Sequence, residues 1–178
     1  MGTDKWILDP NHSELTFKIR HLMISNVSGI FRDFEVTATT LNDDFSQVHV
    51  ILTAPVASID TKNEQRDKHL LSADFFDAEH FPELKFESTG IEKSGEDGFR
   101  MYGNLTLKGV TKAITLALEY GGMINGGERH GTKAGFTVSG TLNRLDWGIN
   151  FNRVLETGGV GLGEQVKIFG EIQLVKQM

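Results

Sequence analysis

The chain of 178 residues contains no cysteine, which excludes disulfide bonds, a thiol nucleophile and a cysteine-ligated metal. It has no apolar run near the roughly 20 residues that a membrane-spanning helix needs. It does not begin with a basic stretch followed by an apolar one, so we expect no secretion signal. The expected location is therefore cytoplasmic, or periplasmic if a signal has been removed.

The chain also lacks an excess of positive charge. It has 18 Lys and Arg against 24 Asp and Glu, with a formal net charge of -6, and the two signs are interspersed. Because binding to phosphate backbones needs clustered cations, we expect no nucleic-acid partner. No tract has the composition of a linker, so residues 1–178 are expected to form a single domain.

Alternation of apolar and polar residues is the main pattern that is present. Residues 13–21 place Leu15, Phe17, Ile19 and His21 on one side and charged or polar residues on the other, as in a half-buried strand. Similar patterns recur along the chain, and with a less regular segment over residues 27–36 they predict about eight strands. The repeats start near residues 48, 84, 101, 114, 134 and 166.

Short turn signals separate most of these segments and predict antiparallel neighbours. A meander with one apolar face either stays open with two exposed edges or closes on itself. We expect closure, and hence an all-β, eight-stranded antiparallel barrel of the lipocalin-like kind. The inward glycines Gly29, Gly103, Gly140 and Gly170 fit bends in tightly coiled strands. A further turn is expected over the glycine-rich residues 121–127.

One segment departs from the strand pattern. Thr61 and Glu64 have the spacing of a capping box, and Pro82 ends the segment. On a helix, Arg66, His69, Leu70 and Ala73 would share one stripe, expected to face the barrel. The sequence therefore predicts one short helix that covers an end of the barrel.

Several long stretches, in a fixed order, carry a family resemblance that extends from about residue 6 to the C-terminus. They are Asp9-Pro10-Asn11-His12-Ser13 with residues 17–22; residues 27–31 with Phe34; residues 58–61 with Arg66-Asp67, His69-Leu70, residues 73–77, Phe81-Pro82 and Phe86; and residues 103–111. On these motifs the chain resembles the YceI-like family of polyisoprenoid-binding proteins.

The resemblance implies a long hydrophobic pore that binds a polyisoprenoid, an isoprenoid quinone precursor or a fatty-acid-like amphiphile, for transport or storage. Periodicity alone favours a filled core, and it is the resemblance that favours a pore. The expected ligand-binding residues are Leu15, Phe17, Ile19, His21, Phe31, Arg66, Leu70, Phe86, Leu105 and Leu107.

Two of these residues have an alternative interpretation. His21 ends an apolar stripe, where a histidine is more often part of a satisfied core than functional. Arg66 either pairs with Asp67, Asp74 or Asp77 and fixes the helix, or faces an anionic head group, which a guanidinium binds well.

Catalysis, metals and cofactors have little support. The serines lack a nucleophile-elbow context, and the six histidines lack the spacing of metal ligands. The glycine-rich residues 158–163 lie between two strand patterns, with no helix after them to complete a dinucleotide site, and favour a loop at the barrel rim. We therefore expect no enzyme, metal or cofactor. A lipid enzyme in a similar barrel and a solid-core interaction module are the alternatives, and pairing of two barrels as a homodimer stays open.

Overall fold

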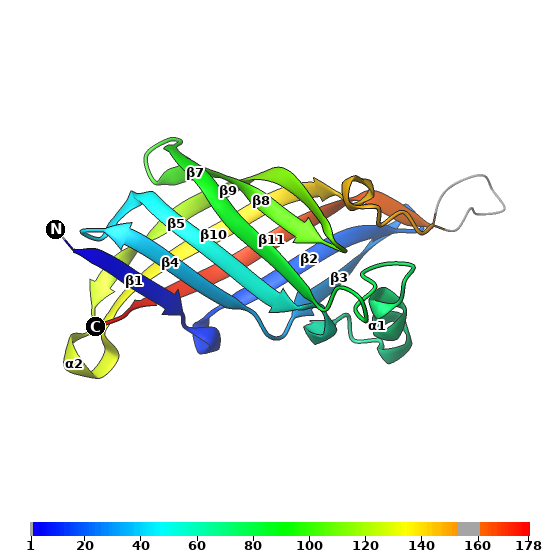
Figure 1. Cartoon of the computed structure of the whole chain (residues 1–178), viewed down its shortest axis with the longest axis horizontal. Helices are drawn as coiled ribbons and strands as arrows, with labels where there is room; N and C mark the ends of the chain where they lie inside the picture. Colours follow the sequence, from blue (N-terminus) through cyan, green and yellow to red (C-terminus); the bar gives the residue numbers. More distant parts are fainter. Residues whose placement is uncertain (1, 153–160) are drawn as a thin grey trace.

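The computed structural model describes residues 2–152 and 161–178 and is an elongated β-barrel (Figure 1). Residues 158–160 of the predicted rim loop lie outside the described residues. Neither α-helix in the described part is long or apolar enough to cross a membrane. The strands are β1 Thr3–Leu8, β2 Glu14–His21, β3 Ser25–Phe31, β4 Glu35–Leu41, β5 Asp44–Pro55, β6 Ile59–Asp60, β7 Glu83–Lys93, β8 Gly98–Leu107, β9 Val110–Asn125, β10 Thr132–Asn143 and β11 Leu162–Lys176. The helices are α1 Glu64–Leu71 and α2 Gly127–His130, with short 3-10 helices η1 Pro10–His12, η2 Val56–Ser58 and η3 Arg144–Trp147.

These segments build a closed barrel of eight strands, because three of the strands are interrupted. β1 and β2 both pair with β11, and on their other side β1 pairs with β4 and β2 with β3. In the same way β5 pairs with β4, and β6 with β3. Each of the pairs β1/β2, β3/β4 and β5/β6 is thus one long strand with a break. Pairing of β1 with β11 closes the ring, and the prediction of an eight-stranded antiparallel barrel is confirmed.

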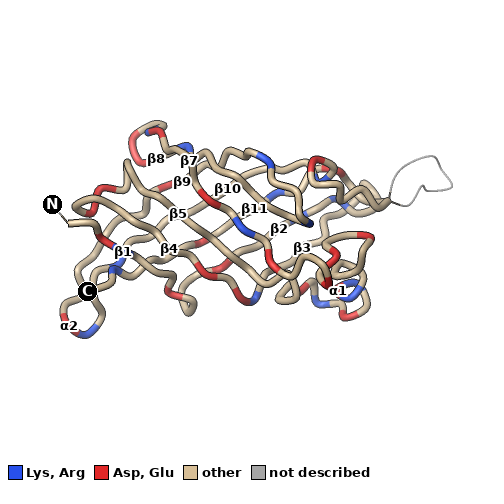
Figure 2. The backbone as a smooth tube through the Cα atoms, viewed as in Figure 1, with Lys and Arg blue, Asp and Glu red and all other residues tan. Residues whose placement is uncertain are grey.

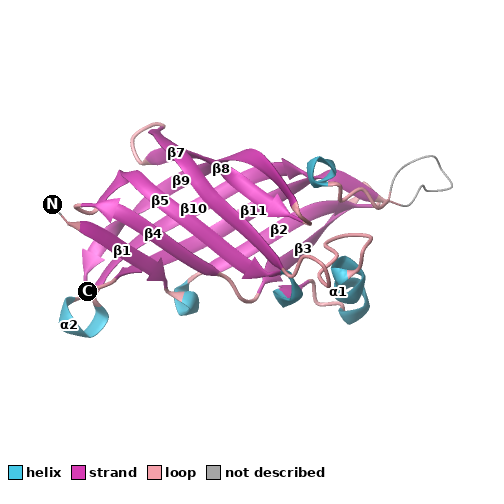
Figure 3. Ribbon diagram, in the orientation of Figure 1, coloured by secondary structure: helices cyan, strands magenta, loops and turns pink. Residues whose placement is uncertain are grey.

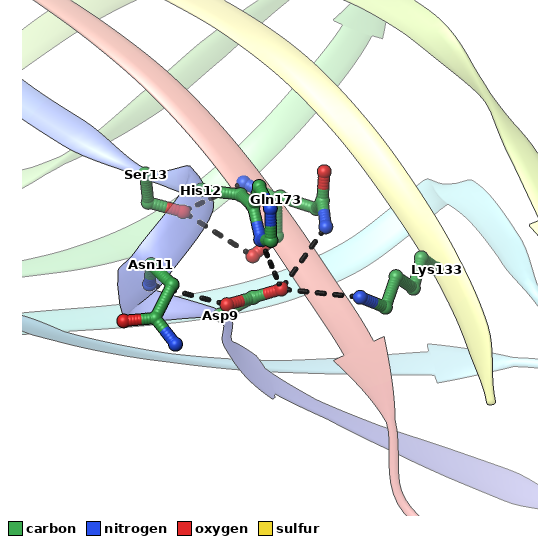
Figure 4. Close-up of polar contacts among 6 residues, drawn as sticks. All are labelled: Asp9, Asn11, His12, Ser13, Lys133 and Gln173. Atoms are coloured by element: carbon green, nitrogen blue, oxygen red, sulfur yellow. Dashed lines mark hydrogen bonds and ion pairs between the residues drawn. The ribbon is translucent and has the colours of Figure 1, made fainter. Parts of the chain in front are cut away.

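A polar cluster around Asp9 fixes the break between β1 and β2 (Figure 4). The Asp9 carboxylate accepts hydrogen bonds from Lys133 Nζ on β10 at 3.2 Å and Gln173 Nε2 on β11 at 3.0 Å, and it contacts His12 Nδ1 at 2.9 Å. Burial raises the pKa of Asp9, but the hydrogen bonds from His12, Lys133 and the Asn11 amide outweigh it and hold the pKa below its ordinary value. The Asp9–Ser13 motif therefore has a structural role.

The turns follow the predicted positions with one exception. Asn42-Asp43 and Lys108-Gly109 have positive φ at both residues, the conformation of type I′ hairpin turns. The prediction of a turn beginning at Gly121 is wrong. β9 continues to Asn125, its pairing with β10 shifts register near Gly135, and the chain reverses through α2.

The helix is shorter than the predicted segment and is capped differently. Its N-cap is Asn63, whose side chain accepts a hydrogen bond from the Arg66 amide, so the predicted capping box with Thr61 is wrong. Thr61 instead donates its hydroxyl proton to Asp67. α1 ends at Leu71, so Ala73 lies beyond the helix and is exposed, outside the predicted stripe. Figure 3 shows α1 at one end of the barrel and α2 beside the C-terminus at the other.

Aromatic side chains fill the end of the barrel near the termini. Trp6 is fully buried, and its indole N–H donates to Thr40 Oγ1 at 3.0 Å. The Phe45 ring lies 5.0 Å from Trp6 and 4.9 Å from Phe136, and Tyr120 lies 5.3 Å from Phe136. These four residues, which we call the aromatic plug, close this end.

Close packing leaves no room for a Cβ at three of the four inward glycines, among them Gly140, where it would lie 2.8 Å from Leu116 Cδ2. None of the four has a positive φ. A Cβ at Gly29 would lie 2.4 Å from the Phe17 ring, and a Cβ at Gly103 would lie 2.4 Å from the Phe86 ring and 2.6 Å from the Glu87 carbonyl oxygen. At Gly170 the nearest atom would be 3.5 Å away, an ordinary contact.

The difference in space for a Cβ between Gly103 and Gly170 predicts a difference in stability between their alanine variants. Gly103→Ala should lower the free energy of unfolding by about 1–3 kcal/mol, because the backbone oxygen that it meets cannot move aside as a side chain could. Gly170→Ala should leave it nearly unchanged. Urea unfolding of both variants checks this, and equal midpoints for the two would contradict it.

Candidate functional site

The barrel encloses a cavity of about 480 Å³, within the size range of small-molecule sites. Its wall includes Phe45 and Phe136 of the aromatic plug, and it also includes His21 and Leu22 at the other end of the barrel. The cavity therefore runs along most of the barrel, and the interior is hollow. This arrangement differs from the solid core that an interaction module would have.

All ten predicted site residues lie on the wall of this one cavity. The alternation on β2 places Leu15, Phe17 and Ile19 inward, yet these side chains are only half-buried because they face open space. Their participation in ligand binding stays a prediction. The full set is Leu15, Phe17, Ile19, His21, Phe31, Arg66, Leu70, Phe86, Leu105 and Leu107.

The cavity opens at the α1 end. His21, Leu22 and His69 belong to its wall and are also exposed to solvent. The His69 ring lies 4.8 Å from the Phe151 ring and 5.0 Å from the Phe75 ring, and its Nε2 lies 2.8 Å from Asp74 Oδ2. The side chains of His21, Leu22, His69, Asp74, Phe75 and Phe151 surround this opening, which we call the mouth.

The wall is apolar and its few charged groups are positive. Among the described residues that line the cavity there is no Asp or Glu, whereas two arginines, Arg66 and Arg144, belong to its wall. His21 and His69 add two imidazoles near the mouth. The interior is thus apolar along its length, with Arg66 and Arg144 as the charged side chains on its wall.

Arg66 is held by Thr61, and in the described residues it forms no ion pair with Asp67, Asp74 or Asp77. Its Nε donates to Thr61 Oγ1 at 2.8 Å and its Nη2 to the Thr61 carbonyl oxygen at 2.6 Å. Thr61 in turn donates to Asp67 Oδ1 at 2.5 Å. A guanidinium has five N–H donors, so three remain without a partner in the described part of the chain. Of the two interpretations of Arg66, the direct pairing with Asp67, Asp74 or Asp77 is not formed in the described residues, and contact with a head group stays a prediction.

Arg144 is a cavity residue that the sequence did not reveal. Its side chain is buried, at 4% exposure, and burial lowers its pKa although Glu164 opposes the shift. It donates to the carbonyl oxygens of Ile149 at 2.7 Å, Phe151 at 2.8 Å and Gly163 at 2.8 Å. Arg144 thereby joins the segment after η3 to the start of β11.

Together the closed meander, the apolar interior and the mouth define a lipocalin-like barrel with an internal cavity. The model of the YceI-like domain matches residues 6–174, and the chain belongs to this family. The chain is 42% identical to the UPF0312 protein SA2479 of Staphylococcus aureus (strain N315) over 159 residues, which are 89% of this chain and 90% of that protein.

Solved structures share the fold. A Campylobacter jejuni YceI protein is 30% identical, with a TM-score of 0.73 over 90% of this chain and 91% of that one. BcnA of Burkholderia cenocepacia has a TM-score of 0.78 at 19% identity, covering 93% of this chain and 98% of that one. A polyisoprenoid binding domain from Saccharophagus degradans has a TM-score of 0.66 at 13% identity, covering 97% and 98%. The last two comparisons concern the fold alone.

Proposed function

We propose that this protein binds a long-chain apolar lipid, such as a polyisoprenoid, inside the barrel and serves in its transport or storage. The observation that carries the proposal is the continuous apolar cavity that runs from the mouth to the aromatic plug. The Saccharophagus degradans domain, which has the same fold, is itself named as a polyisoprenoid binding domain. The wall offers an apolar chain many contacts and few reactive groups, which favours a carrier over an enzyme.

The energetics agree with such a ligand. Burial of one methylene contributes about 0.8 kcal/mol, so roughly twenty buried carbons give on the order of 15 kcal/mol before the ordering of the chain is subtracted. Affinity therefore needs no strong polar anchor. The chain end would lie toward the aromatic plug, and the head toward Arg66 and the mouth histidines.

Mass spectrometry of an organic extract from the purified native protein tests the proposal. We expect one dominant long-chain species, present in proportion to the protein. An extract without such a species, together with failure of the emptied protein to bind a fluorescent apolar probe or a prenyl alcohol, would contradict the proposal.

Arg66→Met tests the orientation of the head. If the three free donors of Arg66 face the head group, affinity for a prenyl diphosphate should fall about tenfold or more, since a charge-assisted pair is lost. Affinity for the corresponding prenyl alcohol should stay almost unchanged. Competition against the apolar probe measures both.

Lys68→Met is the matched control, because this substitution also removes one positive charge from α1. Its ammonium is exposed, 3.9 Å from Glu64, and it does not line the cavity. A lower melting temperature with equal weakening of both ligands for Arg66→Met would assign Arg66 a structural role only. Unchanged diphosphate affinity would remove it from the site.

A further inference from the structure

The hairpin between β2 and β3 ends in three consecutive exposed apolar residues. Leu22, Met23 and Ile24 are 39%, 50% and 79% exposed. The other large exposed apolar residues in the described ranges stand singly in the sequence, for example Ile124 and Phe169. We call residues 22–24 the apolar tip. A contiguous run of exposed apolar side chains is typical of an interaction site.

The turn conformation of the apolar tip does not explain why its side chains are apolar. The Ile24 amide donates to the His21 carbonyl oxygen, and Leu22 and Met23 have φ of 52° and 60°, as in a type I′ turn. This turn favours Asn and Gly, because a left-handed backbone crowds a Cβ. Asn42-Asp43 and Lys108-Gly109 make the same kind of turn with one such residue each. Closing β2 to β3 therefore does not require apolar side chains here.

The apolar tip is held in place beside the mouth of the cavity. Arg20 Nη2 donates to the Met23 carbonyl oxygen at 2.6 Å, and the Leu22 amide donates to the Gly161 carbonyl oxygen at 2.8 Å. Leu22 also belongs to the cavity wall. Apolar surface thus continues from the cavity to the tip, and Figure 1 shows this hairpin at the end of the barrel opposite the termini.

We propose that the apolar tip inserts into the interface of a lipid bilayer and docks the mouth of the cavity on it. A projecting group of three side chains suits this role, because apolar side chains beside a cation such as Arg20 bind at the headgroup boundary. A stable protein partner would need about 800 Å² on each side, and the end of the barrel with α1 carries charges of both signs (Figure 2). The choice of a bilayer rests on the proposed function, because an apolar cargo is drawn from or delivered to one.

Flotation with vesicles of equal parts phosphatidylcholine and phosphatidylglycerol tests the proposal. The wild-type protein should float with the vesicles. The double variant Met23→Gly, Ile24→Thr should bind about tenfold more weakly, because two inserted side chains are lost. Neither residue lines the cavity, and glycine suits the left-handed position, so the melting temperature should be equal or higher.

Ile124→Thr is the matched control, because Ile124 is 66% exposed and lies at the end of β9, beside α2. It should float like the wild type. Binding of the apolar probe without vesicles, measured for every variant, separates failure of docking from failure of the cavity. Wild-type protein that does not float, or a double variant that floats equally well, overturns the proposal. Equal losses in the double variant and in Ile124→Thr overturn it as well.

Discussion

Gly170→Phe should abolish binding of long prenyl chains while leaving short ones bound. Gly170 lies near the middle of β11, opposite Leu15 on β2 and Val138 on β10, and it belongs to the cavity wall. A Cβ there meets nothing closer than 3.5 Å, so a side chain can enter the cavity without displacing the backbone. The ring would divide the mouth half of the cavity from the half next to the aromatic plug.

The size of the effect follows from the carbons excluded. A block that keeps about five carbons out of the deep half removes about 4 kcal/mol, or roughly a thousandfold in affinity, at 0.8 kcal/mol per methylene. A chain short enough for the mouth half should lose little. Competition of farnesol and of solanesol against a fluorescent probe measures the two affinities.

Ser139→Phe is the control for this variant. This substitution adds the same ring to the exposed outer face of β10, and the variant should bind both alcohols like the wild type. Equal weakening of farnesol and solanesol by Gly170→Phe would contradict a cavity used along its length. Gly103→Phe is unsuitable for this purpose, because its Cβ would already overlap the Phe86 ring and the Glu87 carbonyl.

Much of the barrel could be predicted because strands have a period of two. Once the polar and apolar sides of residues 13–21 are separated, the inward position of Leu15, Phe17 and Ile19 follows, whatever the partner strand. The number of strands was also accessible, since each long strand carries its own alternating segment. The breaks at residues 9–13, 32–34 and 56–58 were not, because they interrupt a strand without changing its neighbours.

Local hydrogen bonding was harder to predict, because competing polar residues stand close together in the sequence. Thr61 and Asn63 both precede Glu64 at plausible capping positions, and the backbone at Asn63 decides between them. Thr61 is then free to link Arg66 and Asp67. The hydrogen bonds of Asp9 could not be predicted either, because its partners Lys133 and Gln173 are more than a hundred residues away in the sequence.

Whether the inward face encloses a cavity or a packed core depends on the radius of the closed barrel, which alternation does not encode. The same holds for the mouth, which is formed by side chains from α1, the β2–β3 hairpin and residues 149–152. The role of Arg144 could not be predicted from the sequence for another reason. Its hydrogen-bond partners are carbonyl oxygens, and any residue supplies these, so no pattern of side chains marks its role.

Arg144→Met should be the most destabilising of the substitutions considered. Methionine fills a similar length but leaves the carbonyl oxygens of Ile149, Phe151 and Gly163 without their donor. A buried acceptor without a partner costs about 1–3 kcal/mol, so we expect the free energy of unfolding to fall by about 3 kcal/mol or more. Arg144→Lys should recover part of this loss only, because one ammonium cannot match the planar fork of a guanidinium.

The loss should be concentrated at the mouth, since Arg144 joins residues 149–151 to the first residues of β11. Urea unfolding gives the stability, and amide hydrogen exchange should show faster exchange at these residues than at β4 and β5. Arg100→Met is the control, because Arg100 is exposed on β8 and its loss should change stability by no more than about 0.5 kcal/mol. Equal stability of Arg144→Met and Arg100→Met would show that solvent or a rearranged backbone satisfies the carbonyl oxygens. In that case the hydrogen bonds of Arg144 would not account for the position of residues 149–151 beside β11.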